Sequence, residues 1–174
     1  MNTKIIWFTG LSGSGKTTLA ITFYKLLKRK KYKVRKIDGD VFREKKNHLN
    51  NFTKKNIIKN NLSIINYISK IKHKYEYILV AVISPILIIR QLAKKKFRDN
   101  YYEIYVHCST KTLEKRDTKG LYAEAKKNII KNLIGCNSSI KYQRSRYSKI
   151  DINTDKYNLK KCIQIIKNKI NLKS

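Results

Sequence analysis

Short apolar runs alternate with longer stretches of helical periodicity along the 174-residue chain. Five of the runs predict strands, because they are continuous, apolar and bounded by polar or turn residues. They cover residues 4–9, 32–37, 77–83, 102–107 and 149–152. The run at 77–83 (YILVAVI) is apolar almost throughout, as expected of a central strand that is buried on both faces of a parallel sheet.

Between these runs, apolar residues recur at the spacing of an α-helix. The pattern predicts helices over residues 17–28, 56–72 and 159–170, another from just after Pro85 to about residue 96, and helical structure over 113–132 interrupted at Gly120. Strands that alternate with helices favour right-handed crossovers and a parallel sheet covered on both faces. No linker or repeat divides the chain, so we predict one α/β domain over residues 1–174. Ligands of such folds bind beyond the carboxyl ends of the strands.

Composition excludes several classes of protein. Hydrophobic residues make up 41% of the chain, which argues against disorder. No apolar run approaches the roughly 20 residues that span a bilayer, and residues 1–8 lack the features of a signal peptide. We therefore expect a cytoplasmic protein with no membrane contact. The three cysteines and three histidines are widely spaced, which argues against disulfides and against a zinc site.

The net charge of +30 is extreme, with 41 basic against 11 acidic residues. Clustered Lys and Arg would indicate a nucleic-acid partner. Here the lysines are spread along the whole chain among many Asn and Ile residues, as an AT-rich genome produces, and no aromatic-studded basic stripe is present. Nucleic acid is therefore a disfavoured partner, whereas a positive field should attract small polyanions such as nucleotides.

A phosphate-binding motif, G-x-x-x-x-G-K-[ST], stands between the first predicted strand and the first predicted helix. Its glycines permit positive φ angles, so that consecutive N–H groups can point at one anion near the helix N-terminus. Lys16 should contact the β- and γ-phosphates of ATP, and the Thr17 hydroxyl should ligate Mg²⁺. The predicted ATP-binding residues are Gly10, Leu11, Ser12, Gly13, Ser14, Gly15, Lys16, Thr17 and Thr18. A guanine nucleotide is disfavoured because an Asn-Lys-x-Asp motif is missing.

An acidic pair, Asp38 and Asp40, flanks Gly39 at the end of the second predicted strand, with Arg43 three residues on. A kinase needs a carboxylate to orient or deprotonate the accepting hydroxyl, and another can hold the water shell of Mg²⁺. A nearby arginine can clamp a phosphate of the acceptor. An ordinary Asx turn explains the same residues. The spacing alone leaves both interpretations open.

Together these segments resemble the adenylylsulfate (APS) kinase family. The matching pieces, in family order, are residues 10–18 (GLSGSGKTT), 38–43 (DGDVFR), 83–85 (ISP) and 116–122 (RDTKGLY). The resemblance implies a P-loop kinase with a five-stranded parallel sheet and a mobile lid over about residues 117–142. It also implies transfer of the ATP γ-phosphate, with Mg²⁺, to the 3′-hydroxyl of a nucleoside 5′-phosphoester.

The resemblance further implies catalytic roles for particular residues. Lys16 and Asp40 would be catalytic, with Asp40 nearest the acceptor hydroxyl and Mg²⁺ and with Asp38 in support. Ser84 matches a serine sometimes described as a phosphoserine intermediate. In-line transfer between two bound nucleotides needs no covalent step. We therefore expect the Ser84 hydroxyl to bind a phosphate or to fix the turn before Pro85.

On the acceptor side, the resemblance implies that Arg43 contacts the phosphate, that Phe52 stacks on the base, and that the lid closes over both nucleotides. The predicted acceptor-binding residues are Arg43, Phe52, Asn60, Ser84, Lys119, Gly120, Leu121 and Tyr122.

The segments that would bind the acceptor depart from the family pattern, whereas the segments that would bind ATP match it. Of the expected Glu-Asn-Ile-Arg-Arg only Asn60 remains, and the Asp-Arg beyond Ser-Pro has become Ile89-Arg90. The family's Pro-Tyr-Glu appears as Ser-Ile-Lys at 139–141. Random mutation would not confine the changes to the acceptor-side segments. A change in the identity of the acceptor would.

Divergent family members act in capsule-sugar pathways, where one phosphorylates cytidine diphosphoramidate on its ribose. We predict this small nucleotide as the acceptor, with the choice of base made around residues 56–60 and near Arg90. The alternatives are APS itself and, remotely, a non-catalytic P-loop protein that binds nucleic acid. A homodimer is compatible with either kinase.

Overall fold

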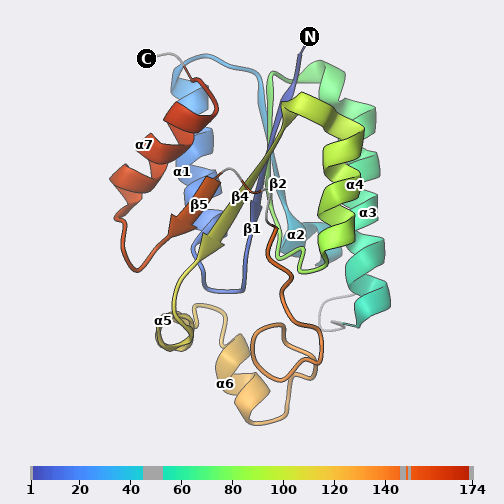
Figure 1. Cartoon of the computed structure of the whole chain (residues 1–174), viewed down its shortest axis with the longest axis vertical. Coiled ribbons are helices and arrows are strands. Elements are labelled where there is room, and N and C mark those ends of the chain that lie inside the picture. Colours follow the sequence, from blue (N-terminus) through green and yellow to red (C-terminus); the bar gives the residue numbers. More distant parts are fainter. Residues whose placement is uncertain (1, 45–52, 146–147, 149, 173–174) are drawn as a thin grey trace.

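One parallel sheet of five strands organises the molecule, as predicted (Figure 1). The computed structural model describes residues 2–44, 53–145, 148 and 150–172. The strand order is β2-β3-β1-β4-β5, and all four pairings are parallel. The strands are β1 (Lys4–Thr9), β2 (Val34–Asp38), β3 (Tyr77–Ala81), β4 (Tyr101–His107) and β5 (Ile150–Asn153).

Strand β1 lies at the centre of the sheet, and its side chains alternate between two hydrophobic cores. Ile6 and Phe8 point into the core on one face, whereas Ile5 and Trp7 point into the core on the other. All four side chains are at most 1% exposed. Burial on both faces explains why this strand is a continuous apolar run rather than an alternating one.

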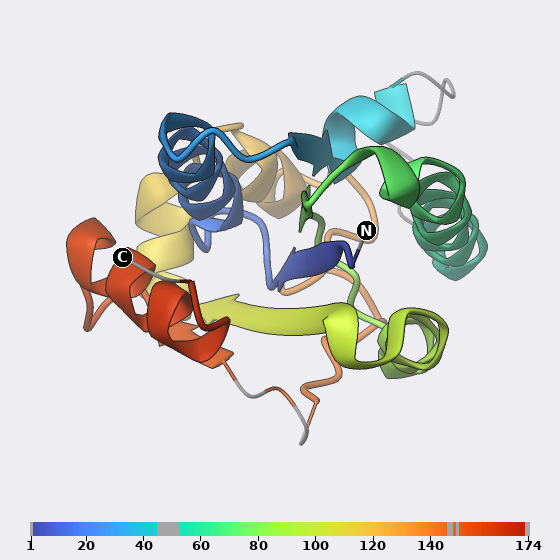
Figure 2. The ribbon, with the colours of Figure 1, turned by 90° about the horizontal axis from the view of Figure 1, so that it is seen from above.

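Two helices cover each face of the sheet (Figures 1 and 2). Helices α1 (Lys16–Arg29) and α7 (Leu159–Lys169) lie on one face, and α3 (Lys54–Ile71) and α4 (Leu87–Phe97) lie on the other. The predicted apolar stripes face the sheet. Within the described parts of the chain, no helix combines the length and the apolar character needed to cross a membrane.

Three short helices lie near the carboxyl ends of the strands. They are α2 (Gly39–Glu44), α5 (Thr110–Arg116) and α6 (Leu121–Lys126), and two 3₁₀ turns, η1 (Lys72–Lys74) and η2 (Arg98–Asn100), precede β3 and β4. Two of the three helices, α5 and α6, are toward the lower end of Figure 1. The prediction of helix up to residue 132 was wrong beyond Lys126. Asn128 and Asn132 adopt φ angles of 58° and 63°, a left-handed conformation that ends a helix.

Helix α2 was not predicted. It begins where the side chain of Asp38 accepts a hydrogen bond from the Asp40 backbone N–H at 3.0 Å, the usual device for starting a helix. Gly39 is required here for space, because a Cβ atom would lie 2.6 Å from Cγ2 of Val82. The turn that carries the acidic pair is thereby held against the end of β3.

Candidate active site

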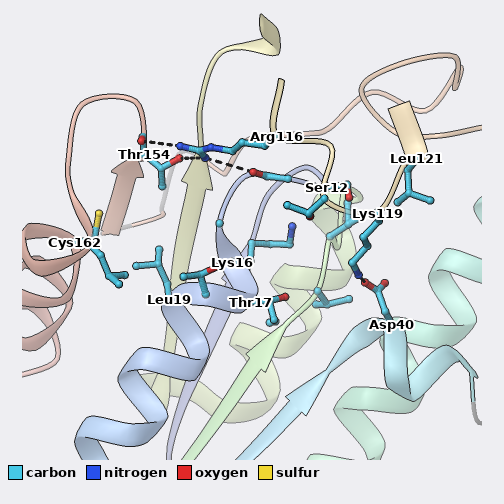
Figure 3. Close-up of a pocket in the computed structure, with 18 of the residues that line it drawn as sticks. Ser12, Lys16, Thr17, Leu19, Asp40, Arg116, Lys119, Leu121, Thr154 and Cys162 are labelled. Atoms are coloured by element: carbon cyan, nitrogen blue, oxygen red, sulfur yellow. Dashed lines mark hydrogen bonds and ion pairs between the residues drawn. The ribbon is translucent and has the colours of Figure 1, made fainter. Parts of the chain in front are cut away.

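A cavity of about 780 Å³ opens beyond the carboxyl ends of β1 and β3 (Figure 3). This volume falls within the range of small-molecule sites. The phosphate-binding loop, α2, the end of β3, the α5–α6 connection and the β5–α7 loop all contribute lining residues. Segments from five parts of the sequence therefore meet at one site.

The phosphate-binding loop adopts the backbone conformations that its glycines predict. Gly10, Gly13 and Gly15 have φ angles of 146°, 75° and 98°. At Gly10 a side chain is excluded outright, because a Cβ atom would lie 1.9 Å from the carbonyl oxygen of Val106. Gly15 directly precedes α1, so the N-terminus of that helix faces the cavity, where it favours an anion.

Lys16 is a buried cation at the floor of this cavity. Its side chain is 8% exposed, and its Nζ donates a hydrogen bond to the Leu11 carbonyl at 2.6 Å. Burial lowers the pKa of Lys16 to about 8, although the negative charge of Asp40 opposes the shift. An entering phosphate would stabilise the charged form of this lysine.

Asp38 connects the phosphate-binding loop to the acidic turn. Its Oδ2 accepts a hydrogen bond from the Thr17 hydroxyl at 3.4 Å, while its Oδ1 caps α2. The two interpretations left open by the sequence, a turn residue and a functional carboxylate, are thus compatible. A hydroxyl beside a carboxylate offers the hard oxygen ligands that Mg²⁺ prefers, and phosphates and waters commonly complete its shell. This donor set fits Mg²⁺.

Asp40 lies on the opposite side of the cavity from the β5–α7 loop and pairs with two cations (Figure 3). Its carboxylate accepts hydrogen bonds from the Lys119 ammonium and from Nη2 of Arg43, the latter at 3.3 Å. Burial would raise the pKa of Asp40, but the Lys119 hydrogen bond and the charges of Lys119, Arg43 and Lys16 together hold the pKa below its usual value. Such a carboxylate is a weak base, and it is better suited to orienting a hydroxyl than to storing its proton.

The RDTKGLY motif joins the two sides of the cavity. Arg116 donates hydrogen bonds to the Thr154 hydroxyl at 2.9 Å, to the Thr154 carbonyl at 3.1 Å and to the Gly13 carbonyl at 3.4 Å. The next residue, Asp117, caps α6 by accepting the backbone N–H groups of Tyr122 at 3.0 Å and Ala123 at 2.9 Å. The motif therefore ties the phosphate-binding loop to the β5–α7 loop and starts a new helix.

The same motif packs α6 against the phosphate-binding loop. The Tyr122 hydroxyl donates to the Ser12 carbonyl at 3.0 Å, and its buried ring joins a small core with Leu113 and Leu133. Leu11 of the phosphate-binding loop packs against this core. Residues 117–142 are thus in direct contact with the phosphate-binding loop.

The structure brings part of the predicted acceptor set to the cavity. Arg43, Lys119 and Leu121 line it, whereas Asn60 and Ser84 do not appear among the described residues of its wall. Phe52 lies outside the described residues. Gly120 has a φ of 69° and directly precedes α6, and the Tyr122 ring lies behind the wall.

Asn60 and Ser84 are buried polar residues beside the acceptor half. Asn60 is 7% exposed and Ser84 is 1% exposed. Neither Oδ1 of Asn60 nor Oγ of Ser84 has a hydrogen-bond partner among the described residues. The Ser84 hydroxyl therefore does not fix its turn. Instead, the Ser84 carbonyl holds the turn, because it accepts a hydrogen bond from Nη1 of Arg90 at 2.5 Å.

Two features escaped the sequence analysis. The β5–α7 side of the cavity carries no recognisable motif, and the available signal was only that Thr154 follows a strand end. The residues that line this side are Thr154, Tyr157, Asn158, Leu159 and Cys162. Arg90 was expected near the acceptor's base, but it is 1% exposed and bound to protein groups.

Comparison with known proteins gives consistent matches. The adenylylsulphate kinase family model matches residues 2–153. A probable adenylyl-sulfate kinase from Archaeoglobus fulgidus is 33% identical over 87% of this chain and 96% of its own length. The cytidine diphosphoramidate kinase of Campylobacter jejuni is 32% identical over 98% of both chains. Among solved structures, the Mycobacterium tuberculosis APS kinase in complex with AMPPNP and APS superposes with a TM-score of 0.87, at 28% identity and 98% coverage of both chains.

Proposed function

The chain belongs to the adenylylsulphate kinase family and is a phosphotransferase, and from this premise we propose that it transfers the γ-phosphate of ATP to the ribose 3′-hydroxyl of a nucleoside 5′-phosphoester. One observation carries the proposal. The buried Lys16 of the phosphate-binding loop and the cation-flanked carboxylate of Asp40 line the same cavity. Positioning plus charge stabilisation is what phosphoryl transfer requires of a protein.

On the donor side, the phosphate-binding loop would hold the phosphates of ATP, and Lys16 would neutralise charge on the transferring group. Thr17 with Asp38, and Asp40 through water, would hold Mg²⁺, which would supply positive charge to neutralise the phosphates of ATP. The base of ATP would lie on the β5–α7 side of the cavity, which Thr154, Tyr157 and Asn158 line. A reaction that consumes ATP fits the cytoplasmic location expected from the sequence.

On the acceptor side, Asp40 would orient the 3′-hydroxyl. The hydroxyl oxygen would form a bond to the γ-phosphorus as the bond between that phosphorus and the ADP oxygen breaks, and the hydroxyl proton would pass to the transferred phosphoryl group and then to solvent. Arg43 and Lys119 line the cavity beside Asp40 and would bind the acceptor's phosphate. When the acceptor binds, its hydroxyl would displace Lys119 from the Asp40 carboxylate, or its phosphate would share the Lys119 ammonium with that carboxylate. Residues 117–142 would act as the lid, since they already contact the phosphate-binding loop.

We propose cytidine diphosphoramidate as the acceptor, and the capsule-sugar setting expected from the resemblance rests on the same identification. Two observations support it: the full-length match to the Campylobacter jejuni enzyme, and the loss of the acceptor-side arginines around Asn60. APS is the second candidate, supported by the family model and by relatives named adenylyl-sulfate kinase. Membership of a kinase family disfavours the non-catalytic nucleic-acid alternative. A homodimer remains a proposal that sedimentation analysis would test.

We expect the cytidine conjugate to be the better substrate by at least about tenfold in kcat/KM, because polar groups left unpaired by the wrong base reject it strongly. The measurement is turnover of ATP with each acceptor. Arg43→Ala should weaken both acceptors alike, since it binds the phosphate that they share, whereas Arg29→Ala, an exposed change at the end of α1, should affect neither. Efficient use of APS with little use of the cytidine compound would overturn this acceptor assignment.

ATP binding should weaken as the pH rises through about 8. Burial lowers the pKa of Lys16 to about 8 in the free protein, and bound phosphates should raise it again. Full affinity is therefore present below pH 8 and is lost above it, by up to about tenfold per pH unit. Calorimetry at pH 8.5 in buffers of different ionisation enthalpy should detect proton uptake on binding.

The matched variant for this test is Lys16→Met, in which the pH dependence and the proton uptake should both disappear. An affinity that stays constant in the wild-type protein between pH 7 and 9 would contradict this role of Lys16.

A further inference from the structure

Arg90 of α4 binds three segments that are far apart in the sequence. Its Nε donates to Oε1 of Glu103 in β4 at 3.1 Å, and its Nη1 donates to the carbonyl of Ser84 at 2.5 Å. Its Nη2 donates to the carbonyl of Gln143. The Arg90 side chain is fully buried, whereas Gln143 at one end of these contacts is exposed. One guanidinium thus holds together a strand, the turn after β3 and the chain just beyond residues 117–142.

Tyr142 and Gln143, which we call the strap, are fastened by further bonds. The Gln143 backbone N–H donates to the Pro85 carbonyl at 2.9 Å, and its side-chain Oε1 accepts the Leu87 N–H at 2.7 Å, at the start of α4. The Tyr142 hydroxyl lies 2.8 Å from the hydroxyl of Thr9, the residue before the phosphate-binding loop. The guanidinium of Arg90 lies 5.1 Å from the centre of the Tyr142 ring. The strap therefore connects α4 with the strand that leads into the loop.

The chemistry of these contacts requires arginine. A buried ion pair is stable only when its remaining hydrogen-bonding groups are also satisfied. Burial raises the pKa of Glu103 even though the charge of Arg90 opposes the shift. The planar guanidinium reaches three acceptors in fixed directions, which a lysine ammonium on a flexible stem cannot reproduce.

The position of Arg90 relates these contacts to the cavity. Residues 117–142 start beside Arg116, which is bound to the phosphate-binding and β5–α7 loops, and they end at the strap. The turn at Ser84 directly follows Val82 and Ile83, which line the cavity. Arg90 itself is not among the described residues that line it.

We propose that Arg90 is a positioning residue that anchors the C-terminal end of residues 117–142 and the turn after β3, and thereby sets the geometry of the acceptor side without contacting a substrate. Arg116 anchors the other end of the same segment. The statement about the acceptor rests on the proposed function, whereas the anchoring is independent of it.

Limited trypsin digestion tests the anchoring. Arg90→Met should speed cleavage after the exposed residues Lys126, Lys127 and Lys131 by at least about tenfold, because local opening of an unanchored segment becomes more frequent. Arg90→Lys should behave similarly, since lysine keeps the positive charge but lacks the planar guanidinium that reaches three acceptors at once. Lys94→Met, an exposed change on the same helix, is the control and should have no effect. Unchanged cleavage in folded Arg90→Met, or full rescue by lysine, would overturn the proposal.

Steady-state kinetics tests the consequence for the acceptor. KM for the acceptor should rise by about tenfold in Arg90→Met, while the Kd of an ATP analogue changes less than about twofold. A change in KM separates positioning from mere instability, which would lower only the active fraction. Equal weakening of both ligands, or an unchanged KM, would contradict the inference.

Gln143→Ala provides a second variant if Arg90→Met fails to fold. It removes the bond to the Leu87 N–H and leaves the Arg90–Glu103 pair intact. It should therefore raise both the rate of trypsin cleavage and the KM for the acceptor, each by a smaller factor than Arg90→Met does. If it shifts neither, the anchor proposal fails. If the wild-type protein phosphorylates neither acceptor, the proposed function fails, and the trypsin result still decides on the anchor.

Discussion

Replacing Lys16 with alanine should lower kcat by at least about 10²-fold while the fold stays intact. The ammonium group is placed beside the phosphate-binding loop by a hydrogen bond to the Leu11 carbonyl. As negative charge shifts from the γ-phosphate toward ADP, a preorganised cation in a site with little water stabilises it more strongly than solvent could. Alanine removes this charge and leaves the loop backbone in place.

Stability should not suffer from the Lys16→Ala change. Burial disfavours the charged form of this lysine in the free protein, so its removal relieves a cost to the folded state. Thermal unfolding should therefore show a Tm no lower than that of wild type. Lys25→Ala, an exposed change on the same helix, serves as the matched control for both measurements. Near wild-type turnover in a folded Lys16→Ala protein would refute the assignment of the donor site.

Asp40→Asn should retain ATP binding and lose about 10² to 10⁴ in kcat. The amide keeps the shape of the side chain but loses the negative charge that faces Lys119 and Arg43. Without that charge, the accepting hydroxyl is no longer oriented for attack on the γ-phosphorus. Single-turnover kinetics, together with the Kd of an ATP analogue, would separate the loss of transfer from a loss of binding.

Asp38→Asn is the informative comparison. Asp38 contacts Thr17 and caps α2. Asparagine retains the cap but loses the charge, so this change should weaken Mg²⁺-dependent ATP binding and leave the free energy of unfolding nearly unchanged. If Asp38→Asn instead abolishes transfer and Asp40→Asn is mild, the roles of the two carboxylates are reversed.

The sheet and its main helices could be predicted because each depends on a local pattern. The apolar run in β3 and the periodic isoleucines of α3 lie where the sequence placed them. The motif at Gly10 to Thr18 is equally local, because its residue types and their spacing are enough to specify the conformation of the phosphate-binding loop. Helix α2 left a weaker signal, an Asp directly before a Gly, that also suits an ordinary turn.

The rest of the site depends on contacts that no local pattern specifies. Arg90 resembled a candidate for base recognition because its neighbour Ile89 departs from the family motif. Its burial follows from Glu103 and Gln143, which come from two other segments. The β5–α7 side is likewise defined only when Thr154 meets Arg116. Such pairings arise from the order of the strands, which the sequence pattern leaves open.

The central place of β1 in the sheet has a consequence for synthesis of the protein. β1 leaves the ribosome before both of its partners, the strands that begin at Tyr77 and Tyr101. At about 5 to 20 residues per second, the apolar sequence Ile-Ile-Trp-Phe waits several seconds for them. A nascent chain that stops before β4 is therefore expected to bind no nucleotide, because the loop after Thr9 then lacks the neighbouring strand whose Val106 carbonyl lies against Gly10. Chaperones that shield short apolar segments should associate with the chain during this interval.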